Sequence, residues 1–88
     1  MIYAICHDSR NIVSGSLKNL SDRGCELISN VVSAGPSFPL RAKIVLDFFE
    51  VSTQQSVTLR AMLCGARRSQ GAWIYTIRWK RRERAVPF

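Results

Sequence analysis

The chain has 88 residues, of which 47% are hydrophobic and 22% are charged. This length and composition predict one folded domain over residues 1–88 and exclude an intrinsically disordered chain. The formal net charge of +7 favours an anionic partner, and the apolar stretches are too short to cross a bilayer.

Residues 2–19 have the pattern of a β-hairpin. Residues 2–6 are short and rich in β-forming side chains, and the turn-forming residues 8–11 follow them. No basic segment precedes the apolar start, so we expect a strand there and not a signal peptide. After a polar turn, residues 25–28 continue as a further strand.

Residues 29–40 are predicted to form a loop. They contain one glycine, two prolines and several serines. Loops of this length are often functional or mobile in so small a domain. The next strand covers residues 41–50, and its apolar residues alternate so that one set shares a face. That set is Ile44, Leu46 and Phe48.

Two further strands complete the pattern, over residues 57–64 and 72–79, and a turn at 69–71 joins them. The inward residues of the first are Val57, Leu59, Ala61 and Leu63. In the second, four large apolar residues on one face are predicted to be core rather than a stacking platform for a ligand. They are Trp73, Tyr75, Ile77 and Trp79. Six strands without a helical period predict an all-β fold, a small antiparallel six-stranded β-barrel.

The turn at residues 19–24 is the strongest candidate for a binding site. Asn19 and Ser21 would point the same way from an extended backbone and converge on one ligand. Gly24 would supply either a positive φ or a close approach of the backbone. Taken alone, the same residues are equally typical of an ordinary hairpin corner.

Residues 15–27 read G-x-L-x-N-L-S-x-x-G-x-x-L, and this pattern resembles the Asp/Asn-x-Ser-x-x-Gly signature of PilZ domains. The match is specific at Asn19, Ser21 and Gly24. In that family the signature lies on a small β-barrel and contacts the bacterial second messenger cyclic di-GMP. The family's other signature, Arg-x-x-x-Arg before the first strand, is missing here, and the only arginine upstream of Asn19 is Arg10.

The resemblance implies a PilZ-like signalling domain of the bacterial cytoplasm. It would act in motility, pilus or biofilm control, as a cyclic di-GMP receptor or as an adaptor. A receptor for this dianion needs guanidinium groups and small polar groups. The implied ligand contacts are Asn19, Ser21 and Gly24, followed by Arg10 and Arg23. Because the arginine signature is missing, a ligand-independent adaptor that binds a protein partner is the alternative, and another chain could also supply the arginines.

Positive charge is concentrated in the last third of the chain. From Arg60 onward there are eight basic residues and one acidic residue, Glu83. The basic segment 78–84 favours an anionic partner such as nucleic acid or a membrane surface. No RNP-type or KH-type motif accompanies it, so a small nucleic-acid-binding barrel is the least favoured alternative. A short helical turn within residues 80–85 also stays open.

Catalysis and metal binding have little support. His7 is the only histidine, and no carboxylate pair, nucleophile motif or P-loop is present. We therefore expect neither an enzyme nor a cofactor. Cys6 and His7 are adjacent and point to opposite faces of a strand, which disfavours a shared metal. The three cysteines are scattered, and we expect them to be reduced and buried in a cytosolic protein.

Overall fold

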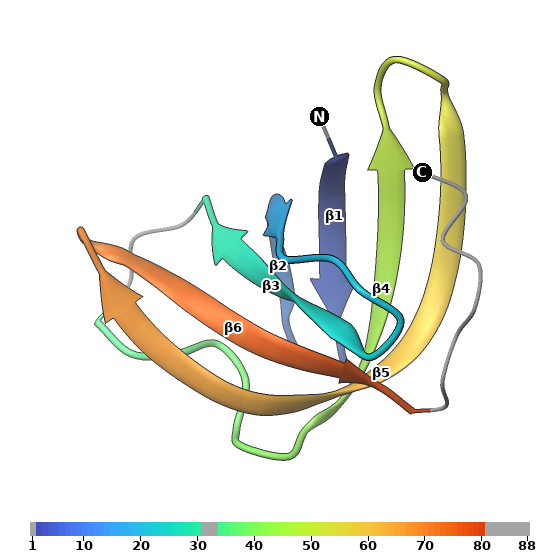
Figure 1. The fold of residues 1–88 in the computed structure, drawn as a ribbon. Helices are drawn as coiled ribbons and strands as arrows, with labels where there is room; N and C mark the ends of the chain where they lie inside the picture. Colours follow the sequence, from blue (N-terminus) through green and yellow to red (C-terminus); the bar gives the residue numbers. More distant parts are fainter. Residues whose placement is uncertain (1, 31–33, 81–88) are drawn as a thin grey trace.

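The computed structural model describes residues 2–30 and 34–80 and shows a closed antiparallel β-barrel of six strands (Figure 1). In chain order the strands are β1 (Ile2–His7), β2 (Ile12–Lys18), β3 (Gly24–Ser29), β4 (Lys43–Glu50), β5 (Gln55–Ser69) and β6 (Ala72–Trp79). Around the barrel they follow the order β1-β2-β3-β6-β5-β4, and β4 pairs with β1 to close it. The predicted all-β, six-stranded antiparallel barrel is confirmed. The described residues include no helix long and apolar enough to cross a membrane.

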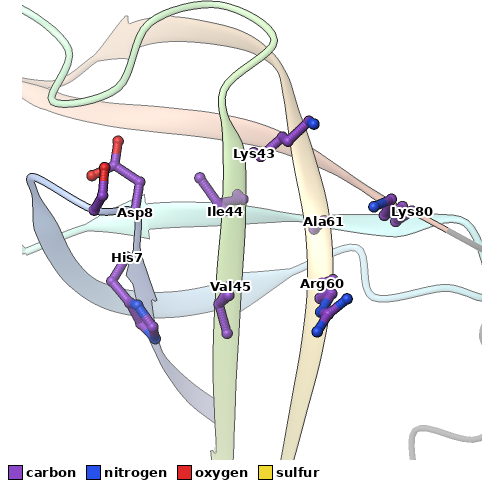
Figure 2. Close-up of a pocket in the computed structure, with 9 residues that line it drawn as sticks. His7, Asp8, Lys43, Ile44, Val45, Arg60, Ala61 and Lys80 are labelled. Carbon is purple, nitrogen blue, oxygen red and sulfur yellow. The ribbon is translucent and has the colours of Figure 1, made fainter.

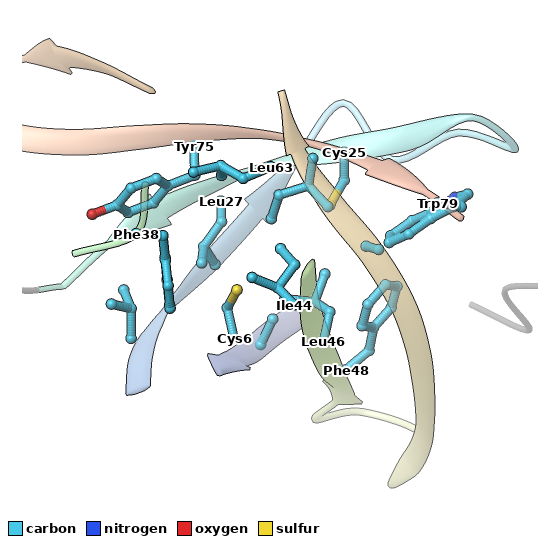
Figure 3. Close-up of a cluster of buried hydrophobic side chains, with 14 residues drawn as sticks. Cys6, Cys25, Leu27, Phe38, Ile44, Leu46, Phe48, Leu63, Tyr75 and Trp79 are labelled. Carbon is cyan, nitrogen blue, oxygen red and sulfur yellow. The ribbon is translucent and has the colours of Figure 1, made fainter. Parts of the chain in front are cut away.

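Alternate residues of the strands point into one core inside the barrel (Figure 3). On β4 the predicted inward residues are buried, namely Ile44, Leu46 and Phe48. On β6, Trp73 packs against the core and the other three predicted residues are buried in it, namely Tyr75, Ile77 and Trp79. The ring centroids of Phe48 and Trp79 lie 5.3 Å apart. The aromatic face of β6 is therefore barrel core, as predicted.

The segment 34–42 adds a core residue that the sequence pattern did not single out. Phe38 is 2% exposed and meets the ring of Tyr75 edge-on, with centroids 5.7 Å apart. The backbone N–H of Ser37 donates to the Tyr75 hydroxyl at 2.8 Å, and Asn11 Nδ2 donates to the Ser37 carbonyl at 2.8 Å. The described part of the predicted loop is therefore anchored to the barrel. Residues 31–33 lie outside the described residues.

Strand β5 extends beyond the predicted range 57–64 at both ends. Its first part pairs with β4 and its last part with β6. A bulge between Leu63 and Gly65 interrupts the register, and such a bulge lets one strand bend between two neighbours. A two-residue hairpin turn at Gln70 and Gly71, both at positive φ, follows the strand and confirms the predicted turn.

Two of the three cysteines belong to the core. Cys6 and Cys25 are buried, and burial raises the pKa of each thiol to about 12. Cys64 is only half-buried, so the predicted burial is wrong at this position, which coincides with the bulge of β5. The ring of His7 lies partly exposed outside the barrel while Cys6 points inward. The two neighbours therefore occupy opposite faces of β1, as predicted.

Candidate functional site

The β2–β3 turn, residues 19–23, carries most of the predicted binding residues at one end of β2. Asn19 has a φ of 55°, which is left-handed, so the expected extended backbone at this position is wrong. Its Nδ2 donates to Glu26 Oε1 at 2.6 Å. Glu26 Oε2 in turn accepts from Arg67 at 3.0 Å. The Asn19 side chain is therefore held along the outside of β3, within a small polar network.

Ser21 is bound within the turn itself. Its backbone N–H donates to the Gly24 carbonyl at 2.9 Å, and its Oγ lies 3.4 Å from the same carbonyl. The Oγ also accepts from the Arg23 N–H at 3.2 Å. From β6, Trp79 Nε1 donates to the Ser21 carbonyl and the Trp79 N–H donates to the Arg23 carbonyl, both at 3.0 Å. These bonds fix the corner of the hairpin and use the Ser21 hydroxyl to do so.

Gly24 is required because two backbones approach each other closely. A Cβ at this position would lie 1.9 Å from the Ile77 carbonyl oxygen on β6. The φ of Gly24 is not positive, so of the two roles predicted for it the close approach is the one present. Gly15 has the same role, since its Cβ would lie 1.9 Å from the Ile28 carbonyl oxygen. Both glycines allow the strands to close into a narrow barrel.

The two candidate arginines lie far apart. Arg23 is exposed in the β2–β3 turn, whereas Arg10 is exposed in the turn that joins β1 to β2. The seven residues of β2 separate these turns, which corresponds to about 20 Å. The structure therefore brings Asn19, Ser21, Arg23 and Gly24 together and leaves Arg10 at the other end of the strand.

A basic hollow of about 470 Å³ lies on the outer surface of β4 and β5 (Figure 2). Three cationic side chains line it: Lys43, Arg60 and Lys80. The lining also includes Val45, which is half-buried and faces outward, and the core residues Ile44 and Ala61. The end of β1 supplies the rest of the lining: His7, Asp8 and Ser9. In Figure 2, His7 and Asp8 lie on one side of β4, and Arg60 and Lys80 lie on the other.

The cations of the basic hollow lack acidic partners among residues 2–30 and 34–80. Within these residues, Arg67 forms an ion pair with Glu26, and His7 Nε2 lies 3.2 Å from Asp47 Oδ2. Among the described residues, the only carboxylate in the lining is Asp8, whose Oδ1 accepts the backbone N–H groups of Arg10 and Asn11 at 2.7 and 2.6 Å. These two bonds, in that order, lower the pKa of Asp8, so it is ionised at neutral pH.

Sequence reasoning missed the basic hollow because its cations come from separate elements. Alternation within residues 57–64 places Arg60 on an outward face, which was the available signal. Only the register of β4, β5 and the end of β6 brings Lys43 and Lys80 beside it. The remaining basic residues of the predicted tail, from residue 81 onward, lie outside the described residues, as does most of the predicted helical turn at 80–85.

An apolar hollow of about 320 Å³ lies on another part of the outer surface, over β1 and β4. Three large side chains line it and remain substantially exposed: Tyr3 at 43%, Ile5 at 48% and Phe49 at 44%. Tyr3 and Phe49 are directly paired across the two strands. Polar residues also line it, among them Ser14, Asn30, Asp47 and Ser56.

A scan against protein-family models finds no match for this chain, and searches of curated proteins and of solved structures find none either. The structure offers three surface features as candidate sites: the β2–β3 turn, the basic hollow and the apolar hollow.

Proposed function

We propose that this chain is a PilZ-like signalling domain that acts as an adaptor and binds a protein partner without catalysis. The observation that carries this proposal is the apolar hollow. Outward positions of an antiparallel barrel ordinarily hold polar side chains, because they face water. Here Tyr3, Ile5 and Phe49 occupy outward positions on two paired strands.

The composition of the apolar hollow suits a protein partner. Contiguous exposed apolar surface with a polar border is typical of protein interaction sites. Tyrosine and phenylalanine are enriched in interfaces, where they supply large contact areas at little cost in side-chain entropy. The expected partner packs an apolar side chain against the rings of Tyr3 and Phe49 and makes hydrogen bonds to the polar residues of the hollow.

The second candidate is a cyclic di-GMP receptor that uses the β2–β3 turn. It is favoured by the Asn-x-Ser-x-x-Gly pattern and by the exposure of Arg23 in that turn. Three observations stand against it. Glu26 holds the Asn19 amide, the Ser21 hydroxyl is bound inside the turn, and Arg10 lies at the far end of β2. Each buried contact that the missing arginine pair would have made is worth about 2–5 kcal/mol of binding free energy. Losing one such contact therefore weakens the affinity more than tenfold.

Two measurements on the purified protein distinguish these candidates. Calorimetric titration with cyclic di-GMP at about 150 mM salt should give no heat up to high micromolar ligand, for the wild type and for Ser21→Ala alike. Micromolar binding that Ser21→Ala weakens would overturn the adaptor proposal in favour of the receptor.

The adaptor is then tested by affinity capture with paired variants. Phe49→Ser removes a ring of the apolar hollow, and Met62→Ser removes an apolar side chain of similar exposure, 40%, that does not line the hollow. A partner retained by wild type and Met62→Ser should be lost with Phe49→Ser. Equal capture by both variants would contradict the proposed surface.

A further inference from the structure

We propose that the basic hollow is a binding site for a small organic phosphate, in which the cations hold the phosphate and the apolar surface holds the organic group. This site is separate from the apolar hollow, and the inference does not depend on the adaptor function. It also differs from the β2–β3 turn, which shares no residue with the lining of the hollow.

The register places four of the hollow's residues, each from a different part of the chain, in one row. His7 pairs with Val45 on β4, and Val45 pairs with Arg60 on β5. The Lys80 N–H donates to the Arg60 carbonyl at 3.1 Å, which puts the end of β6 next in the row. Neighbouring strands are about 4.8 Å apart, so the row spans about 14 Å. This is the length of a small molecule rather than of an extended polymer.

The positive charge of the lining, on the side of the row toward β5 and β6, indicates an anionic ligand group. Lys43, Arg60 and Lys80 bring three positive charges to the lining, and no carboxylate of the described residues forms an ion pair with them. Like charges repel, so a bound anion would relieve an unfavourable arrangement. The arginine fork matches two phosphate oxygens, and lysines act as flexible point charges beside it.

The lining on the side of the row toward β1 suits an organic group attached to that phosphate. Val45 lies between His7 and Arg60 and presents apolar surface in the middle of the hollow. Beyond it, the two backbone bonds to Asp8 hold a carboxylate in place. This carboxylate would accept a hydrogen bond from an N–H or O–H group of the ligand and would repel a second phosphate. A phosphate monoester with a donor at its far end fits this order of groups, whereas a continuous nucleic-acid backbone does not.

The volume agrees with this ligand class. Small-molecule sites typically measure about 300–1,000 Å³, and the hollow measures about 470 Å³. The hollow is open to solvent, so we expect moderate affinity that weakens as salt increases.

The test is an NMR titration of the full ¹⁵N-labelled chain at low salt with three probes: adenosine monophosphate, adenosine and inorganic phosphate. We expect the monophosphate to shift the amides around Lys43, Arg60 and Lys80. Adenosine should cause no shift, and inorganic phosphate should bind about tenfold more weakly because it leaves the apolar surface and Asp8 unused.

Paired variants complete the test. Arg60→Gln should weaken binding of the monophosphate about tenfold, as expected for one charged hydrogen-bonding partner. Arg68→Gln, an exposed arginine of the same strand outside the hollow, should leave it unchanged. Lys43→Gln and its control Lys18→Gln repeat the comparison on other strands, so that one poorly folded variant does not decide the result.

Four outcomes would overturn the inference. The first is equal binding of adenosine and its monophosphate. The second is an equal effect of Arg60→Gln and Arg68→Gln. The third is binding of single-stranded RNA or anionic vesicles with no response to the monophosphate. Shifts confined to residues 19–24 would likewise assign the ligand to the β2–β3 turn and not to the hollow.

Discussion

The basic hollow and the apolar hollow have opposite chemistry, although the same two strands contribute to both. Along β1, Tyr3 and Ile5 line the apolar hollow and His7 lines the basic one. Along β4, Phe49 belongs to the apolar hollow and Lys43 to the basic one. Beneath both, the alternate residues of these strands fill one continuous core. The outward positions of a barrel can therefore hold two unrelated binding surfaces while the inward positions keep a single fold.

Asp47 lies at the boundary between the two surfaces. It lines the apolar hollow, and its Oδ2 is 3.2 Å from Nε2 of His7, which lines the basic hollow. Its Oδ1 accepts from Thr58 Oγ1 at 2.6 Å. This polar contact separates the apolar surface from the cations, so each surface can bind its own partner.

The largest expected effect comes from disrupting the barrel on which both surfaces lie. Gly24→Ala would place a methyl group against the Ile77 carbonyl, so β3 and β6 must move apart. We expect a loss of about 3 kcal/mol in the free energy of unfolding, measured with denaturant. Gly35→Ala is the matched control, since nothing lies within 4 Å of its Cβ position. Equal stability of the two variants would show that the barrel is wider than described.

Thiol labelling tests whether the core beneath the two surfaces stays closed. Because burial raises the pKa of Cys6 and Cys25 to about 12, very little of either thiol is ionised at pH 8. Iodoacetamide should therefore label Cys64 first, and the other two cysteines only after denaturant is added. Mass spectrometry of digested protein gives the order. Rapid native labelling of Cys6 would mean that β1 opens readily.

A smaller effect on stability is expected from removing the Asp47 carboxylate, which lies between the two surfaces. Asp47→Ala removes the acceptor of the Thr58 hydroxyl and of the His7 ring, and we expect a cost of about 1 kcal/mol in unfolding free energy. Thr58→Ala in the Asp47→Ala background should then cost less than it does in the wild type. Strictly additive effects would show that the two side chains do not stabilise each other.

The smallest expected effect concerns acid stability at the edge of the basic hollow. The lowered pKa of Asp8 means that its contribution to stability is present above its ordinary value of 3.8 and is lost as pH falls through the lower folded value. Asp8→Ala should therefore narrow the difference in stability between pH 5 and pH 2, slightly, in chemical denaturation at each pH. An unchanged profile would show that the two backbone bonds are not maintained in solution.

Alternation in the sequence predicted the barrel well, because burial of one strand face imposes it directly. The inward positions on β4 and β6 were correct for this reason. The candidate site was predicted less well. Arg10 is close to Asn19 in the sequence, but an intervening strand separates them. The left-handed backbone of Asn19 and the placement of Phe38 depend on tertiary contacts, and the basic hollow depends on register, so none of these could be read from local patterns.

Closure of the barrel has a consequence for how the chain folds. Strand β1 pairs with its neighbour in the sequence, β2, but its second edge pairs with β4, which is distant in the sequence. Such non-local pairing is slow, typically milliseconds to seconds in all-β domains. During synthesis, the free edge of β1 is therefore exposed from the completion of β3 until β4 emerges, with Tyr3 and Ile5 beside it. In that interval, pairing of this edge with a second copy of the chain competes with closure of the barrel.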